Sequence, residues 1–428
     1  MKIKLAVLFG GMSVEHEVSV ISALQAVASL DTNKYDIYPI YMTKNNEFYT
    51  GPDAGFIESY RDIPALLKKC TRCVFIKDGN KVKLLRYPFK RFGNNVLTNI
   101  DVAFPIVHGT NVEDGALQGY LKTLGLPFVG CDVLSSAVGM DKYVMKTVLM
   151  QAGVPVLDCI RINVLEFAEP EKVLDACEAK FGYPVIVKPV NLGSSVGISL
   201  AKNRKALLKS LDDAFRYAPQ LLVERAITDL TEINCSVLGD VDFAEASECE
   251  QPLKTDEILS FADKYTGGSG GGAKGGKLGA KGGKLGAKGG KLGGAKNSGS
   301  KGAGMASLSR KIPADISPER REEIRTMAVK AFQALGCNGV SRIDFMIDGQ
   351  TDKVYLNEIN TIPGSLSFYL WKPVGVEYTD LLDRMIELAL KRRRQEDSFV
   401  YSFESNILAI DRSFTSNGGS KGAKGGKV

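Results

Sequence analysis

Two strand-like segments late in the chain restrict its fold more than any other feature. Apolar and polar residues alternate over 340–347 and again over 354–360, and the short stretch between them is rich in Asp and Gly. This pattern predicts a β-hairpin folded about Thr351. With unbroken alternation, odd-numbered side chains such as Ile343 and Phe345 face a core, and even-numbered side chains face away from it.

Four polar side chains share the even-numbered face of this hairpin. The predicted register sets Asp344 opposite Glu358 and Arg342 opposite Asn360. Two carboxylates and an amide oxygen suit the oxygen coordination of Mg²⁺, and an adjacent arginine suits a transferring phosphoryl group. An exposed strand face with an ordinary salt bridge would show the same pattern. The abrupt Thr-Ile-Pro-Gly turn at 361–364 favours a functional site, because it can direct backbone N–H groups.

A second candidate site lies in the middle of the chain. Lys188 ends the apolar strand Val185–Pro189, and Gly-Ser-Ser-Val-Gly follows at 193–197. A lysine and a loop of backbone N–H donors can hold nucleotide phosphates. No Gly-Lys-Ser/Thr follows, so this is not a Walker motif, and a hairpin turn explains the loop equally well.

Apolar strands alternate with amphipathic segments along most of the chain, which predicts an α/β protein. A chain of 428 residues exceeds one compact core, so two or three domains are expected. The region up to Gly139 reads as a small parallel α/β domain, with Ser13 as a candidate cap for its first helix. The predicted strands are Lys4–Phe9, Ile37–Met42, Val102–Val107, Val185–Pro189, Gly197–Ala201 and Leu221–Glu224; the predicted helices are Ser13–Leu30, Gly115–Gly125, Asp141–Gly153, Pro318–Gly336 and Tyr378–Arg394.

Two glycine- and lysine-rich segments carry the positive charge of the chain. The unit Gly-Ala-Lys-Gly-Gly-Lys-Leu occurs three times over 272–292, and a close copy ends the chain at 422–428. Removing the eight lysines of 267–302 and the three of 417–428 from a net charge of +6 leaves −5 for the remainder. The high backbone entropy of glycine and the mutual repulsion of the lysines predict disorder over 267–303 and about 413–428. The alternative is that the repeated unit is a recognised peptide.

Other features limit the compartment and the partners. No apolar run reaches the roughly 20 residues of a membrane span, and the N-terminus is unlike a signal peptide, so we expect a cytoplasmic protein. The eight cysteines are scattered, and Cys70-x-x-Cys73 has no second pair, so all are expected to be reduced thiols. The acidic remainder gives no basis for a specific nucleic-acid partner.

Six motifs together resemble the ATP-grasp superfamily and, within it, the D-alanine–D-alanine ligase family. They occur in the family's order and span the chain up to about Arg394. The motifs are Gly10–Ser19, His108–Gly115, Met140–Lys142, Val185–Gly197, Arg342–Asp344 and Asn357–Gly364.

The resemblance implies an ATP-grasp fold, α/β and in part α+β. Residues 1–139 would form an N-terminal parallel α/β domain that binds substrate, and 140–225 a small central lid domain. Residues 226–396 would form a catalytic domain around an antiparallel sheet, interrupted by the insertion at 267–303. Residues 397–428 would be an extension and tail.

The resemblance also implies a reaction. Such a ligase uses ATP and two Mg²⁺ ions, which Mn²⁺ can replace, to join two D-alanines through a D-alanyl phosphate for peptidoglycan precursor synthesis. Relatives commonly form homodimers. By resemblance, Lys142, Lys188 and Ser195 contact the ATP phosphates, Glu224 the adenine and Glu232 the ribose, and Asp344, Glu358 and Asn360 hold metal. Glu15 meets the ammonium of the first D-alanine with His108 beside it, Ser194 orders Glu15, and Arg342 and the Gly364 N–H stabilise the oxyanion.

His108 and His16 are the two histidines of the chain, and only His108 is expected at the site. It ends a predicted strand, at the edge where open α/β sheets bind ligands, whereas His16 is expected to be structural.

The chain departs from the family where the second substrate would bind. Tyr265 is retained, which favours an amine acceptor, but the glycine–lysine repeats follow directly. Ser365 begins an altered segment in which Tyr369 stands where a serine is usual. These departures leave two alternatives open: another amine acceptor, such as D-serine or a peptide, and a non-catalytic polyanion-binding protein that acts through its repeats.

Overall fold

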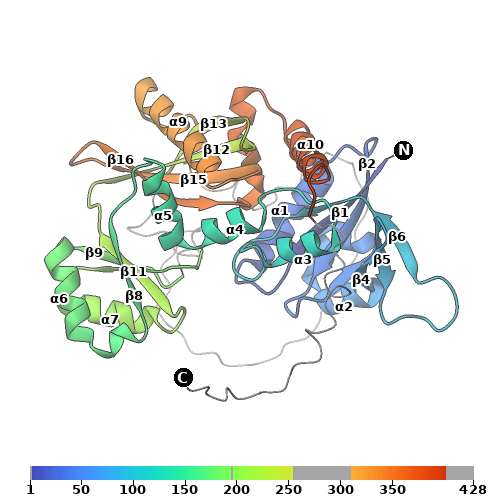
Figure 1. The fold of residues 1–428 in the computed structure, drawn as a ribbon, viewed down its shortest axis with the longest axis horizontal. Coiled ribbons are helices and arrows are strands. Elements are labelled where there is room, and N and C mark those ends of the chain that lie inside the picture. Colours follow the sequence, from blue (N-terminus) through green and yellow to red (C-terminus); the bar gives the residue numbers. More distant parts are fainter. Residues whose placement is uncertain (1, 194–195, 254–309, 402–428) are drawn as a thin grey trace, which may run out of the picture. The chain divides into compact units, whose positions relative to one another are not determined.

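Three β-sheets follow one another along the chain (Figure 1). The computed structural model describes residues 2–193, 196–253 and 310–401. The predictions for the repeats, the C-terminal tail, Ser194, Ser195 and Tyr265 therefore lie outside the described residues. Residues up to Leu390 form one compact unit. The described α-helices are α1 (His16–Ser29), α2 (Ile63–Lys69), α3 (Ala116–Leu124), α4 (Val133–Met140), α5 (Lys142–Gln151), α6 (Pro170–Phe181), α7 (Arg204–Ala214), α9 (Pro318–Ala334) and α10 (Tyr378–Glu396).

The first sheet has the strand order β6-β5-β4-β3-β2-β1-β7. Its parallel part is the one expected: β1 (Ile3–Gly10) pairs with β2 (Tyr35–Met42) on one side and β7 (Val102–Pro105) on the other. Four antiparallel strands of three, eight, six and five residues extend it and were not predicted. They are β3 (Phe48–Thr50), β4 (Thr71–Asp78), β5 (Lys81–Arg86) and β6 (Val96–Ile100).

Helix α1 begins later than predicted, and Ser13 is not its cap. The segment after β1 turns first, since the Ser13 amide donates to the Gly11 carbonyl. The Ser13 hydroxyl accepts from the Glu15 amide at 3.1 Å instead of from the first helical turn. The helix starts at His16, so Glu15 stands at its N-terminal edge.

The second sheet is small and antiparallel, with the order β10-β9-β11-β8 (green, at the left of Figure 1). Its strands are β8 (Cys159–Asn163), β9 (Val185–Pro189), β10 (Ser199–Ala201) and β11 (Gln220–Arg225). Apolar residues of α6 and α7 pack on one face, among them Leu174, Leu207 and Leu211. Lys188 and Glu224 project from the other face, from paired strands.

The third sheet is antiparallel and contains the predicted hairpin. Its order is β14-β13-β12-β15-β16. Ile343 and Phe345 pack under α9 against Phe332, as the odd-numbered side of the alternation predicts. The strands are β12 (Leu230–Gly239), β13 (Ala244–Pro252), β14 (Arg310–Lys311), β15 (Gly339–Asp348) and β16 (Lys353–Asn360).

One core joins the two ends of the chain. Leu381, Leu382 and Ile386 of α10 are buried in the same apolar cluster as strand β1. Trp371, which is 1% exposed, belongs to this cluster too. The C-terminal segment that follows the hairpin is thus held against the first sheet.

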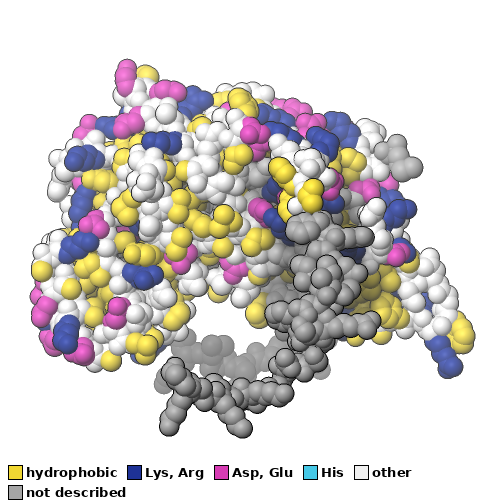
Figure 2. Space-filling view, in the orientation of Figure 1, with side chains coloured by type: hydrophobic (Ala, Val, Ile, Leu, Met, Phe, Trp, Pro, Cys, Tyr) yellow, Lys and Arg dark blue, Asp and Glu magenta, His cyan; other side chains and the backbone are white. Residues whose placement is uncertain are grey.

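Charged side chains of both signs share the described surface. On the face seen in Figure 2, Lys and Arg side chains are interspersed with Asp and Glu. All eight cysteines are free thiols, as predicted. None of the described helices combines the length and the apolar character that crossing a membrane requires.

Candidate active site

A cleft of about 860 Å³ is lined by residues from all three sheets. Eleven of the residues predicted from the sequence line it, although they are spread over some 350 positions of the chain. They are Glu15, His108, Lys142, Lys188, Glu224, Glu232, Arg342, Asp344, Glu358, Asn360 and Gly364.

The hairpin register is the predicted one at the four polar positions. Asp344 pairs with Glu358, and Arg342 pairs with Asn360. Arg342 Nε and Nη2 each donate to one Asp344 carboxylate oxygen at 2.7 Å. The Asn360 amide nitrogen donates to Asp344 Oδ2 at 3.1 Å. Burial works against the charge of Arg342, but the Asp344 carboxylate outweighs it and the pKa of Arg342 is raised.

A β-bulge next to these residues adds a group that the sequence pattern did not reveal. The register shifts between Asp344 and Phe345, so that Phe345 pairs with Leu356 and leaves Asn357 as an extra residue. The Asn357 side-chain oxygen accepts a hydrogen bond from Lys188 Nζ at 3.2 Å. The bulge therefore links the third sheet to the second.

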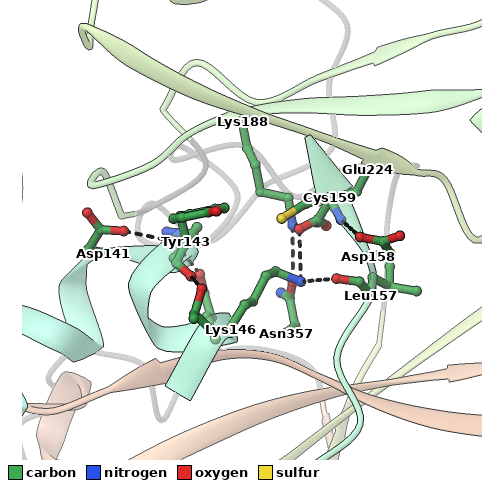
Figure 3. A network of polar contacts seen from close by, with 12 residues as sticks. Asp141, Tyr143, Lys146, Leu157, Asp158, Cys159, Lys188, Glu224 and Asn357 are labelled. Atoms are coloured by element: carbon green, nitrogen blue, oxygen red, sulfur yellow. Dashed lines mark hydrogen bonds and ion pairs between the residues drawn. The ribbon is translucent and has the colours of Figure 1, made fainter. Parts of the chain in front are cut away.

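A buried ion triad lies on the cleft-facing side of the second sheet (Figure 3). Glu224 is 1% exposed, and its two oxygens pair with Lys188 at 2.7 Å and Lys146 at 2.9 Å. Burial alone would raise the pKa of Glu224, but the two ammonium groups lower it. Burial lowers the pKa of Lys146. Lys146 was missed from the sequence, because a lysine on an amphipathic helix normally faces solvent.

Lys142 begins α5 and stands between the sheets. Its Nζ atom donates to the Leu192 carbonyl at 2.8 Å and lies 3.5 Å from Glu358 Oε2. Only 7% of its side chain is exposed. Lys142 and Lys188 thus place two cations in the cleft beside the acidic face of the hairpin.

Glu15 lies where two glycine segments approach closely. A Cβ atom on Gly109 would lie 3.0 Å from Glu15 Oε2, and one on Gly193 would lie 3.3 Å from the same oxygen. Gly109 also has a φ of +84°, which side chains rarely adopt. Glycine at both positions lets the backbone close around this carboxylate.

His108 is buried and bonded through both ring nitrogens. Its Nδ1 atom lies 2.8 Å from the Ile362 carbonyl, which can only accept, so Nδ1 carries a proton. Burial lowers the pKa of His108, so Nε2 is an acceptor and receives the Ser22 hydroxyl at 3.1 Å. The Ser22 oxygen in turn accepts from the Ser365 amide at 2.9 Å. His16, by contrast, bonds Gly11 and Tyr41 away from this cleft, as a structural histidine would.

Glu113, a further buried acid, was not singled out from the sequence. It accepts from the amides of Gly109 and Ile362, each at 2.9 Å, and lies 3.2 Å from the Thr361 hydroxyl. Burial raises the pKa of Glu113 to about 8. Glu113 and His108 together tie the turn after β16 to the first sheet.

The altered segment forms a left-handed turn. Ser365, Leu366 and Ser367 have φ values of 52°, 50° and 50°, which are costly for residues with a side chain. Ser365 is 1% exposed, and among the described residues neither it nor Tyr369 lines the cleft. The Tyr369 hydroxyl donates to Glu250 at 3.2 Å, and the guanidinium of Arg310 stacks on its ring.

The hairpin face has the donors that a divalent cation requires. Asp344, Glu358 and Asn360 supply carboxylate and amide oxygens, and the bond from the Asn360 nitrogen to Asp344 leaves the amide oxygen as its donor. Within the described residues, no three His, Cys, Asp or Glu side chains gather as a metal site. A metal here would be held by two carboxylates and the amide.

Comparisons with known proteins agree with this arrangement. The family model described as D-ala D-ala ligase N-terminus matches residues 4–131, and the one described as D-ala D-ala ligase C-terminus matches 148–274 and 300–387. The two segments of the C-terminal match are separated by residues 275–299, which belong to the glycine- and lysine-rich insertion.

Relatives and solved structures give the same result over nearly the whole chain. A D-alanine–D-alanine ligase of Thermosipho melanesiensis is 34% identical, covering 95% of this chain and 99% of the relative. The one of Caldicellulosiruptor bescii is 36% identical, covering 94% and 99%. The D-alanine–D-alanine ligase structure from Coxiella burnetii has a TM-score of 0.70 at 29% identity, covering 92% of this chain and 97% of that one. The VanG D-Ala:D-Ser ligase from Enterococcus faecalis has the same TM-score and identity, covering 91% and 100%. The chain belongs to the D-alanine–D-alanine ligase family.

Proposed function

We infer that the chain is an ATP-dependent ligase that joins two D-alanines into D-alanyl-D-alanine for peptidoglycan precursor synthesis. The observation that supports this most strongly is the paired Asp344 and Glu358, with Arg342 beside them, in one cleft with Lys142 and Lys188. Phosphoryl transfer to a carboxylate requires cations and metal ligands around the crowded negative charge. Family membership over both halves of the chain favours this reaction over a polyanion-binding protein.

The nucleotide is proposed to lie between the second and third sheets. Lys142 and Lys188 would contact its phosphates, Glu232 its ribose, and Glu224 its adenine edge. The ion pairs of Glu224 with Lys146 and Lys188 hold that carboxylate ionised, which makes it an acceptor for an amino group. Ser195 is proposed for the phosphate loop on the basis of its place in the sequence.

The first D-alanine is proposed to bind with its ammonium at Glu15 and its carboxylate near Arg342. An oxygen of that carboxylate attacks the γ-phosphorus, ADP leaves, and a D-alanyl phosphate results. The amine of the second D-alanine then attacks the acyl carbon, loses a proton, and phosphate leaves. Arg342 and the Gly364 N–H would stabilise the oxyanion of the tetrahedral intermediate.

Asp344, Glu358 and Asn360 are proposed to hold two Mg²⁺ ions, which Mn²⁺ can replace. Bound metal would neutralise charge on the transferred phosphoryl group. Neighbouring side chains hold the proposed metal ligands in place. Arg342 orients Asp344 through two hydrogen bonds, and Lys142 lies beside Glu358.

Substrate positioning by His108 is proposed to act through the backbone. Its bond to Ile362 and the contact through Ser22 to Ser365 hold both sides of Gly364. Ser194 is proposed to order Glu15, and Tyr265 to close over the site, by their places in the motifs.

We propose three domains at 1–139, 140–225 and 226–396, which the three successive sheets support, with an extension after 396. A homodimer and a cytoplasmic location are proposed by resemblance to the family.

The test is an acceptor panel. The full chain is incubated with ATP, Mg²⁺ and D-alanine, and ADP release and dipeptide mass are followed. Parallel samples add D-serine, D-lactate or a Gly-Ala-Lys-Gly-Gly-Lys-Val peptide. We expect D-alanine alone to give ADP and D-alanyl-D-alanine; ADP release only with another acceptor would contradict the proposal.

A further inference from the structure

A second arginine lines the same cleft as Arg342, and the reaction described above assigns it no role. Arg310 stands in β14, at the edge of the third sheet, and 10% of its side chain is exposed. Its Nη1 atom pairs with Glu250 Oε2 at 2.7 Å, and its Cζ atom lies 4.1 Å from the centre of the Tyr369 ring. Stacking on an aromatic ring fixes the plane of a guanidinium and therefore the directions of its N–H donors.

Glu250 and Tyr369 hold this arginine. Glu250 is 2% exposed and also accepts from the Asn234 amide at 2.9 Å and from the Tyr369 hydroxyl at 3.2 Å. The hydroxyl of Tyr369 is thus the donor of its hydrogen bond with Glu250. Burial and the charge of Glu250 raise the pKa of Tyr369 to about 12, so that the proton remains in place at neutral pH. Tyr369 therefore supports Arg310 and does not itself face the substrate.

The sheet register gives the distance from this cluster to the reacting end of the cleft. Glu250 pairs with Asn234 across β13 and β12, and Asn234 pairs with Asp344 across β12 and β15. Directly paired side chains share one face. Neighbouring strands lie about 4.8 Å apart, so Glu250 stands roughly 10 Å from Asp344 along this row.

An amino acid that attacks beside Arg342 spans this interval. Its amine nitrogen approaches the acyl carbon to about 3 Å. Its own carboxyl carbon lies about 2.5 Å beyond the amine nitrogen. Adding a carbon–oxygen bond of about 1.2 Å and an ion pair of about 2.8 Å brings the total to roughly 9.5 Å. This is close to the separation of Glu250, which pairs with Arg310, from Asp344, which pairs with Arg342.

We propose that Arg310 binds the carboxylate of the second D-alanine, with Glu250 and Tyr369 as positioning residues. A guanidinium has five N–H donors and can bond two carboxylates at once, one from Glu250 and one from the substrate. The acceptor then lies with its carboxylate on Arg310 and its amine directed at the acyl phosphate. This inference rests on the proposed function.

Hydroxylamine separates the inference from the proposed function. It captures D-alanyl phosphate as D-alanyl hydroxamate, and it has no carboxylate for Arg310 to bind. We expect Arg310→Met to form hydroxamate from D-alanine and ATP at close to the wild-type rate. The KM of the second D-alanine should rise roughly 10- to 100-fold, the effect of losing a charge-assisted hydrogen bond.

D-Alaninamide tests the recognised group directly, because it is an acceptor without the carboxylate charge. Wild-type protein should prefer D-alanine to D-alaninamide, and Arg310→Met should lose most of this preference. An unchanged preference, or hydroxamate formation that falls together with dipeptide synthesis, would overturn the inference. Wild-type protein that forms no hydroxamate would overturn the proposed function instead.

Two further variants keep the test decisive if removal of Arg310 prevents folding around the buried Glu250. Arg310→Lys keeps the charge without the fork, and Tyr369→Leu removes the stacking ring. Both variants should raise the KM of the acceptor. Tyr369→Phe, which keeps the ring, should raise it less. The matched control is Arg216→Met, because the Arg216 side chain is 76% exposed. An acceptor KM that is unchanged in both Arg310→Lys and Tyr369→Leu would refute the assignment.

Discussion

The hydroxyl of Ser22 donates a hydrogen bond to Nε2 of His108, because the other ring nitrogen already donates to the Ile362 carbonyl. The same oxygen accepts the Ser365 amide. One side chain of α1 therefore fixes both the tautomer of a cleft histidine and the first residue of the left-handed turn.

Ser22→Ala should leave a buried ring nitrogen and a buried amide without partners. We expect the free energy of unfolding to fall by about 1–3 kcal/mol and kcat/KM for D-alanine to fall as Gly364 loses its support. Urea unfolding and steady-state kinetics measure the two effects. Ser22→Thr, which keeps the hydroxyl, should retain most of both; Ser29→Ala on the same helix is the control. Wild-type stability and kinetics in Ser22→Ala would show that the contacts of Ser22 with His108 and Ser365 support neither the fold nor the site.

Glu113 should make stability depend on pH. Its pKa rises from an ordinary 4.5 to about 8 on folding, so the folded protein keeps a proton that the unfolded chain releases. The stability that this proton supplies is complete below pH 4.5 and is lost as the pH rises through 8. His108, whose pKa is lowered, acts in the opposite direction but is common to both proteins compared.

The comparison is between wild type and Glu113→Gln, unfolded in urea at several pH values from 5 to 8.5. The wild-type free energy of unfolding should fall by a few kcal/mol more than that of the variant over this range. Parallel curves for the two proteins would show that Glu113 titrates normally.

Lys146→Met should destabilise the second sheet and weaken nucleotide binding. Removing one cation from a fully buried triad leaves Glu224 with Lys188 alone, and we expect a loss of about 3 kcal/mol. Thermal melting with and without ATP measures it, together with the KM for ATP. Lys209→Met, which breaks an exposed pair with Asp213, should leave the melting temperature close to that of the wild type. Equal losses in the two variants would argue against the triad.

Glu358→Gln and Asp344→Asn should both abolish turnover but differ in stability. The Glu358 side chain is 25% exposed, so its replacement should hardly change the melting temperature. Asp344 neutralises the buried Arg342 through two bonds, so its replacement should destabilise the protein by about 3–5 kcal/mol. Activity measured against Mg²⁺ concentration, with melting curves, tests both. Near wild-type turnover in Glu358→Gln would remove the metal assignment.

The sequence was sufficient where a local period decides the structure. The alternation across Arg342 and Asp344 predicted the hairpin register, and β1, β9 and α9 were found where apolar spacing placed them. The sequence was insufficient where contacts between distant segments determine the position of a side chain. Lys146 became a site residue only because Glu224 of another strand neutralises it, and Asn357 only because a bulge turns it toward Lys188. Arg310 and Glu250 meet Tyr369 through strand pairing and a turn that no periodic pattern encodes.

The three left-handed residues at 365–367 store conformational energy of roughly 1–2 kcal/mol apiece. We expect the segment to relax when an anchor such as Ser22 is removed, and Tyr369 to shift with it. Acceptor preference should then respond to a substitution in α1 at a residue that does not itself line the cleft.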